Sequence, residues 1–116
     1  MSVALKPSQA LGLWRDVVLN EVTEREHDLT TRQMAILLSI YMDPPPHTVR
    51  GLAAKLNVTK PVITRALDTM GQMKLVMRRR DPKDRRNVII GKTVEGALYL
   101  ERFSDLVVEK AKWLAK

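Results

Sequence analysis

The chain has 116 residues, enough for one domain with a hydrophobic core, and its apolar content of 45% argues against disorder. It contains no cysteine, which excludes a disulfide scaffold, a zinc–thiolate site and a thiol redox sensor. The formal net charge of +7 is concentrated in residues 48–92, which hold 12 Lys or Arg and 3 Asp or Glu. Positive charge gathered in this way attracts a polyanion.

The distribution of apolar residues favours a protein that stays out of the membrane. The longest apolar run, residues 34–42, is too short to span a bilayer, and the N-terminus lacks the pattern of a signal peptide. We therefore expect a cytoplasmic protein that forms a single domain over residues 1–116.

Helical periodicity predicts a first helix over residues 8–26, with Ser8 at its N-cap. Its apolar positions fall on one stripe, made of Leu11, Trp14, Val18 and Val22. A second helix begins at Thr30, which forms a capping-box pattern with Gln33. Apolar residues on several faces of this helix predict that most of it is covered. Three consecutive prolines, residues 44–46, end it and form a stiff linker.

Two further helices are predicted in close succession. Thr48 can cap a short helix that ends at Leu56, and Asn57 tolerates the left-handed conformation of a tight turn. Thr59 then caps the fourth helix, residues 59–73, with Pro61 in its first turn. One face of the fourth helix is expected to pack on the third through Ile63, Ala66, Leu67 and Met70. Helix, short turn and capped helix make a helix-turn-helix.

A β-hairpin is predicted after the fourth helix. Its strands are residues 75–80 and 87–90, and the loop between them is rich in turn formers. Thr93 then caps a last helix that runs to about Lys116. The predicted fold is mainly α with a small β-hairpin wing, a winged helix-turn-helix over residues 30–92 between terminal helices 8–28 and 93–116.

Polar side chains on the fourth helix and cations on the hairpin form a candidate site for duplex DNA. In a major groove, arginine can bond guanine, threonine can meet a base or a phosphate, and Val62 can touch a thymine methyl. The wing, residues 78–90, carries arginines of the kind that narrow minor grooves attract, and Asp84 is expected to pair with Arg86. The predicted DNA-binding residues are Thr48, Thr59, Lys60, Pro61, Val62, Thr64, Arg65, Arg78, Arg80, Lys83, Asp84, Arg85 and Arg86. The alternative interpretation of these side chains is an ordinary solvated surface.

Four sequence segments carry a resemblance to a known family: "LTTRQMAIL", "LAAKLNVTKPVITRALDTM", "LVMRRRDPKDRRNVII" and "KTVEGALYL". Together they resemble the MarR family of winged-helix transcriptional regulators over residues 29–98, and the Asp-x-Arg signature within "DPKDRRN" is the most specific part. The resemblance implies that the fourth helix reads the major groove and that Arg86 enters the minor groove, oriented by Asp84. It also implies a two-fold dimer on a palindromic operator, usually acting as a repressor.

The sequence departs from the family pattern in the helix end and in length. Lys74 stands where the family usually has a glycine, and a left-handed lysine costs about 1 kcal/mol, so we expect a differently shaped helix end. Gly71 occupies a position where a strong helix former is usual. Family dimers use the first helix and two C-terminal helices, and this chain has room for one helix after the wing.

The terminal helices are the candidate dimer interface. Their apolar residues can form a self-complementary patch or can cover only the domain's own core. The predicted interface residues are Leu11, Trp14, Val18, Phe103, Leu106, Val107, Trp113 and Leu114. Members of the family often bind small phenolic or lipophilic effectors, so a small-molecule effector is a further expected partner. Met34, Tyr41 and Trp14 are candidates to line its pocket, or else core residues.

No enzyme signature is recognisable. His27 and His47 have no ligand-like spacing to each other or to a carboxylate, and glycine-rich phosphate loops and nucleophile motifs are missing from the sequence. We expect no catalysis, no metal and no cofactor. The leading hypothesis is a sequence-specific regulator that binds double-stranded DNA as a homodimer. The alternatives are a winged-helix adaptor for protein interaction and a nonspecific nucleic-acid binder.

Overall fold

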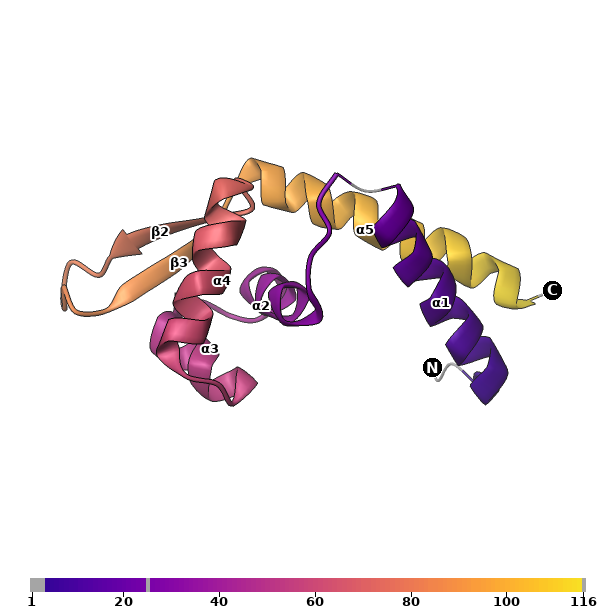
Figure 1. The fold of residues 1–116 in the computed structure, drawn as a ribbon, viewed down its shortest axis with the longest axis horizontal. Coiled ribbons are helices and arrows are strands. Elements are labelled where there is room, and N and C mark those ends of the chain that lie inside the picture. Colours follow the sequence, from indigo (N-terminus) through magenta and orange to yellow (C-terminus); the bar gives the residue numbers. More distant parts are fainter. Residues whose placement is uncertain (1–3, 25, 116) are drawn as a thin grey trace. The chain divides into compact units, whose positions relative to one another are not determined.

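A computed structural model describes residues 4–24 and 26–115 of the chain (Figure 1). In chain order the elements are α1 (Pro7–Thr23), α2 (Thr31–Met42), β1 (His47–Thr48), α3 (Val49–Leu56), α4 (Lys60–Gln72), β2 (Val76–Arg80), β3 (Val88–Lys92), α5 (Val94–Lys112) and a short 3-10 helix (Trp113–Ala115). The described residues form two compact units. The first contains α1 and α5 from Leu100 onward, and the second contains residues 29–99. The prediction of a mainly helical fold with a small hairpin is confirmed.

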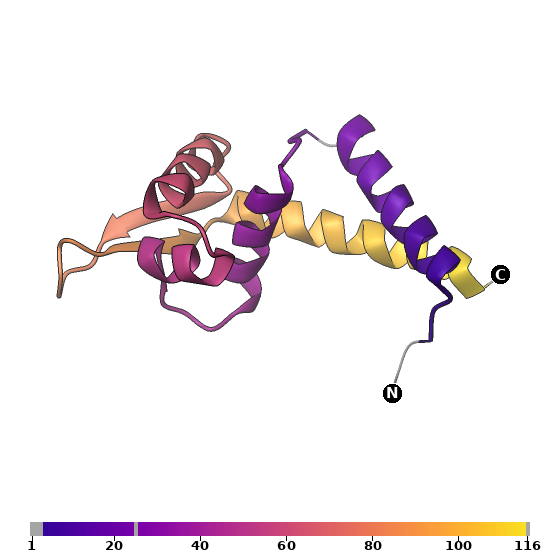
Figure 2. The same ribbon diagram turned by 60° about the horizontal axis from the view of Figure 1, so that its bottom comes forward.

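The first unit pairs α1 with the C-terminal part of α5 (Figures 1 and 2). Ser8 is not the N-cap that the sequence predicted. The cap is Lys6, because Pro7 fits the first helical position and Gln9 Oε1 accepts the Lys6 backbone N–H at 2.9 Å. The Gln9 side chain also donates to the Leu114 carbonyl at 3.2 Å, which ties the start of α1 to the end of the chain.

Two helix ends in this unit come earlier than predicted. The helix α1 ends at Thr23 rather than at residue 26. The helix α5 ends at Lys112 and continues as a single 3-10 turn, and Lys116, its predicted end, lies outside the described residues.

The second unit begins with α2, whose predicted cap is confirmed. The Gln33 backbone N–H donates to Thr30 Oγ1 at 3.0 Å, and the Thr30 N–H donates to Gln33 Oε1 at 2.9 Å. Ile36, Leu37 and Ile40 have no exposed surface, so the helix is covered on several faces as its apolar pattern predicted. It forms the centre of the core of this unit.

The helix-turn-helix prediction is confirmed in its local detail. Thr48 Oγ1 accepts the Gly51 N–H at 2.9 Å and so caps α3. Asn57 adopts the left-handed conformation, with φ of 57°. Thr59 is the N-cap of α4, although its side chain makes no capping hydrogen bond. The predicted apolar face of α4 is buried through Ile63, Ala66, Leu67 and Met70.

The hairpin that forms the wing belongs to a three-stranded antiparallel sheet, whose strand order is β1-β3-β2. The hairpin of β2 and β3 projects away from the helices of its unit in both views (Figures 1 and 2). Each strand begins one residue later than predicted. The strand β3 also continues two residues beyond Ile90, because Lys92 pairs with Val76. The strand β1 was not predicted, since two residues are too few for an alternating pattern.

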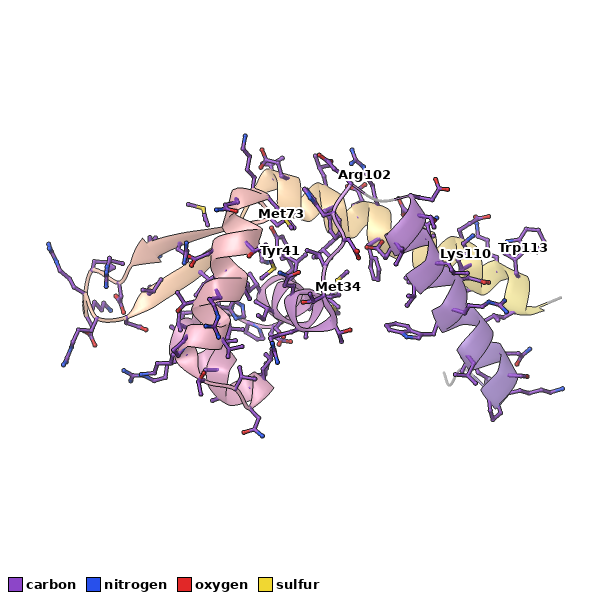
Figure 3. All side chains as sticks on the ribbon, viewed as in Figure 1. Met34, Tyr41, Met73, Arg102, Lys110 and Trp113 are labelled. Atoms are coloured by element: carbon purple, nitrogen blue, oxygen red, sulfur yellow. The ribbon has the colours of Figure 1, made fainter. Side chains whose placement is uncertain are left out.

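A hydrogen-bonded junction joins α2, the end of α4 and the start of α5. Tyr41 is the residue of α2 at this junction (labelled in Figure 3). Its hydroxyl donates to the Leu75 carbonyl at 2.9 Å and accepts the Thr93 N–H at 3.0 Å. Thr93 Oγ1 donates to the Lys74 carbonyl at 2.6 Å and accepts the Gly96 N–H at 2.9 Å, so Thr93 is the predicted cap of α5. The junction fixes where the wing leaves the helices.

Lys74 and Gly96 show what this junction requires. Lys74 adopts the left-handed conformation that usually belongs to glycine, with φ of 63°, so the differently shaped helix end is not seen. A Cβ on Gly96 would overlap the Tyr41 hydroxyl and the Leu75 carbonyl, and would lie 2.8 Å from Tyr41 Cζ. Glycine is needed there because the Tyr41 hydroxyl meets the backbone of α5 directly.

Candidate nucleic-acid interface

The exposed face of α4 carries the polar residues that the sequence placed there. Since Ile63, Ala66, Leu67 and Met70 turn into the core, the opposite side of the helix is left to solvent. Its exposed residues are Lys60, Pro61, Thr64, Arg65, Asp68 and Gln72, and Thr59 lies exposed at the N-cap. A helix with one short polar and cationic face can enter a major groove.

Two of the predicted DNA-binding residues are only partly exposed to solvent and so less accessible to DNA. Val62 is half-buried on the flank of α4. Thr48 is also half-buried, and its hydroxyl oxygen is engaged in capping α3. The structure therefore places Val62 beside the exposed face of α4, and Thr48 outside α4, where β1 meets α3.

The tip of the wing is a loop held by two carboxylates. Asp81 accepts the Lys83 backbone N–H at 2.9 Å on one oxygen and the Asn87 side-chain amide at 3.3 Å on the other. The hydrogen bond from the Lys83 backbone N–H is the main cause that lowers the pKa of Asp81 from its ordinary value. Asp81 therefore stabilises a backbone turn at the tip of the hairpin.

The second carboxylate, Asp84, orients Arg86 as the sequence predicted. Asp84 Oδ1 accepts the Arg86 backbone N–H at 3.1 Å and lies 3.5 Å from the Arg86 Nε. The Arg86 side chain is 92% exposed, so the guanidinium that Asp84 orients lies in solvent. This arrangement presents a cation at the very tip of the hairpin.

The other predicted wing arginines differ in how they are held. Arg80 Nη1 donates to the Arg85 carbonyl at 2.8 Å, across the loop. Arg78 is ion-paired with Asp68 of α4, with 2.7 Å between Arg78 Nη1 and Asp68 Oδ1. Lys83 and Arg85 are exposed. The wing therefore offers three exposed cations at its tip, Lys83, Arg85 and Arg86, while Arg78 in the middle of β2 is attached to α4.

The terminal helices leave apolar side chains exposed in the first unit. Val17 of α1 is buried, but the neighbouring predicted stripe is not: Leu11 is 72% exposed and Trp14 is 63% exposed. Five more apolar side chains of the terminal helices are exposed: Val18, Leu19, Val22, Val108 and Trp113. The Trp113 side chain projects away from the ribbon (Figure 3). The predicted interface residues Phe103, Leu106, Val107 and Leu114 are half-buried. Large exposed apolar side chains grouped in this way are often found where proteins associate.

Sequence reasoning missed two parts of this architecture. The pairing of Asp68 with Arg78 depends on how α4 packs against β2, which no local pattern encodes. The Tyr41 junction was missed for the same reason, although an isolated glycine near the start of α5, Gly96, was a usable signal of close packing.

Neither a candidate metal cluster nor a membrane-spanning helix is found in the described part of the chain, residues 4–24 and 26–115. Among those residues, no group of three or more His, Cys, Asp or Glu side chains could hold a metal ion. Within the same residues, each helix is too short or too polar to cross a membrane.

Comparison with known proteins identifies relatives of this fold. Residues 29–88 match the model of the MarR family, and no match was found among curated proteins. A MepR variant from S. aureus bound to an oligodeoxyribonucleotide is 23% identical, with a TM-score of 0.79 over 91% of this chain and 75% of that chain. A crystal structure of MarR is 26% identical, with a TM-score of 0.69 over 94% of this chain and 81% of that chain.

A third relative, BldR from Sulfolobus solfataricus, is described as a transcriptional regulator. It is 27% identical, with a TM-score of 0.64 over 87% of this chain and 68% of that chain. These similarities confirm the predicted winged helix-turn-helix fold.

Proposed function

Because the chain belongs to the MarR family, we propose that it is a transcriptional regulator that binds double-stranded DNA as a homodimer. The observation that carries this proposal is the pairing of an exposed polar helix face on α4 with a cationic wing tip in one compact unit. A relative with this fold, the MepR variant, is bound to an oligodeoxyribonucleotide.

The two elements would engage different grooves. The helix α4 enters the major groove, where Arg65 reaches guanine and Thr64 reaches a base or a phosphate. The wing tip enters the neighbouring minor groove, where Arg86 meets the negative potential of a narrow groove. Asp84 holds the Arg86 backbone and guanidinium in one direction, which reduces the entropy lost when Arg86 binds.

Electrostatic attraction to the phosphates supplies much of the proposed affinity for DNA. Residues 48–92 carry a net charge of +9, against +7 for the whole chain, and Lys60, Lys83 and Arg85 are exposed around the two reading elements. Each cation that neutralises a phosphate releases a condensed counterion, so affinity falls as salt rises. With about 6 to 10 phosphate contacts, the slope of log affinity against log salt is about −0.9 per contact.

A second copy of the chain would cover the exposed apolar residues of the terminal helices. Leu11, Trp14 and Trp113 are too exposed in one chain to serve only its own core. A two-fold dimer matches a palindromic site, with half-sites about one helical turn apart. Repression follows where such a dimer occupies a promoter, and a small-molecule effector would act by changing the affinity of the dimer for that site.

Selection of bound sites from a pool of random duplexes tests the proposal, with the stoichiometry measured on the selected sequence. The expected result is a palindrome bound by two chains. A pool bound without enrichment indicates a nonspecific binder. A protein that ignores duplexes at low ionic strength indicates an adaptor for protein interaction.

The wing assignment has its own test. Arg86→Ala should weaken binding to the selected site at least tenfold, because it removes a wing-tip cation whose side chain is 92% exposed. Arg102→Ala is the matched control, since Arg102 is an exposed arginine of α5 in the other unit. Equal affinities of the two variants would contradict the role of the wing tip.

A further inference from the structure

The ion pair between Arg78 and Asp68 links the two proposed reading elements. Arg78 lies in the middle of β2, and Asp68 lies on the exposed side of α4. Arg78 Nη1 is 2.7 Å from Asp68 Oδ1, a distance typical of a charge-assisted hydrogen bond. The pair therefore joins the helix to the hairpin through their side chains.

The sheet register explains why Arg78 turns toward α4. Side chains alternate between the faces of a strand, so Arg78 and Val76 share one face of β2 while Arg79 occupies the other. Val76 is buried, and the residue opposite Arg78 on β3, Ile90, is buried too. Arg78 thus extends from the inner face of the hairpin, where α4 lies.

Asp68 is the acidic residue of α4, one turn beyond Arg65 on the same exposed side. A carboxylate on a face that approaches phosphates is repelled unless a cation compensates it. Asp68 remains 53% exposed while it holds Arg78, whose side chain is 35% exposed. An ion pair this exposed contributes little to stability, typically about 0–1 kcal/mol, so its effect should be visible mainly in DNA binding.

We propose that Asp68 is a specificity-determining residue that holds Arg78 away from the DNA phosphates and so limits sequence-independent binding. The inference rests on the proposed function. While the pair holds, Arg78 releases no counterion from the duplex. Loss of the Asp68 charge frees Arg78 for a phosphate, which strengthens binding to any sequence and lowers the preference for the operator.

The central experiment is a salt titration of binding to random duplex for the wild-type protein and Asp68→Asn. One added phosphate contact makes the slope of log affinity against log salt steeper by about 0.9 per bound chain. At about 0.1 M salt this corresponds to an affinity up to about tenfold higher. Asp105→Asn, at an exposed position of α5, is the control that makes the same change in net charge.

Two further variants separate the mechanism from a general charge effect. Asp68→Asn combined with Arg78→Gln should return the slope to the wild-type value, because the freed cation is gone. Asp68→Glu keeps the charge within reach of Arg78 and should also retain the wild-type slope. Melting temperatures measured alongside should show that all variants fold.

The consequence for specificity is measured by repeating the selection from random duplexes. Asp68→Asn should enrich a less restricted set of sites than the wild type, with a several-fold lower ratio of operator to random affinity. The inference is overturned if Asp68→Asn behaves as Asp105→Asn does, or if its gain persists without Arg78. By contrast, a wild-type protein that binds no duplex overturns the proposed function itself.

Discussion

Replacement of glycine by alanine is expected to change stability in opposite directions at two helical positions of the second unit. Gly71 lies near the end of α4, and a Cβ built on it meets nothing within 4 Å. Gly96 lies near the start of α5, where a Cβ would overlap the Tyr41 hydroxyl and the Leu75 carbonyl. Alanine is therefore expected to stabilise the protein at the first position and to destabilise it at the second.

The magnitudes follow from the surroundings of each glycine. Gly71→Ala gains helix propensity without a clash, worth about 0.5–1 kcal/mol. Gly96→Ala gains the same propensity, but it must displace the Tyr41 hydroxyl, which bonds the Leu75 carbonyl and the Thr93 N–H. The two part-buried partners left without their hydrogen bonds cost about 1–3 kcal/mol each, so after the gain in propensity a net loss of about 1–5 kcal/mol is expected.

The assay is urea unfolding of both variants against the wild type, with the midpoint and the slope compared separately. For a domain of this size, 1 kcal/mol corresponds to about 4 °C in melting temperature, so thermal melts provide a second reading. Equal midpoints for the two alanine variants would refute the packing argument, because helix propensity alone treats both positions alike.

Three other perturbations test the same unit. Lys74→Gly should raise stability by about 0.5–1 kcal/mol in urea unfolding, because glycine adopts the left-handed conformation without strain; a loss would contradict the strain at this position. Tyr41→Phe should cost about 2–6 kcal/mol by the same measurement, since it leaves the same two partners without their hydrogen bonds and changes little else; an unchanged midpoint would show the junction to be dispensable. The pKa of Asp81 is lowered on folding, so its contribution to the wing loop is fully present above pH about 4 and is lost as the pH falls through the lowered value. An NMR titration of the Asp81 carboxyl checks this, and an unshifted or raised pKa would contradict the turn geometry.

The sequence predicted the parts of the fold that depend on near neighbours. The caps at Thr30, Thr48 and Thr93 and the left-handed turn at Asn57 were found, because each depends on residues within about four positions. The Asp84 and Arg86 pair was found for the same reason.

The parts that sequence reasoning missed depend on packing between distant segments. The strand β1 exists because His47 and Thr48 pair with Ile90 and Ile89 of β3, more than forty residues later in the chain. The α1 cap was misplaced because a proline at the first helical position outweighed a serine in the next one. The attachment of Arg78 to α4 likewise required the three-dimensional placement of the wing.

The most direct test of the central claim is the affinity of the purified protein for duplex DNA measured across ionic strength. The account predicts tight binding at low salt and a steep linear fall of log affinity with log salt, of about −0.9 for each phosphate contacted. Exposed cations at the wing tip, Arg86 above all, should account for part of that slope. A flat profile, or no binding at the lowest ionic strength, would contradict the claim that this cationic surface exists to hold DNA.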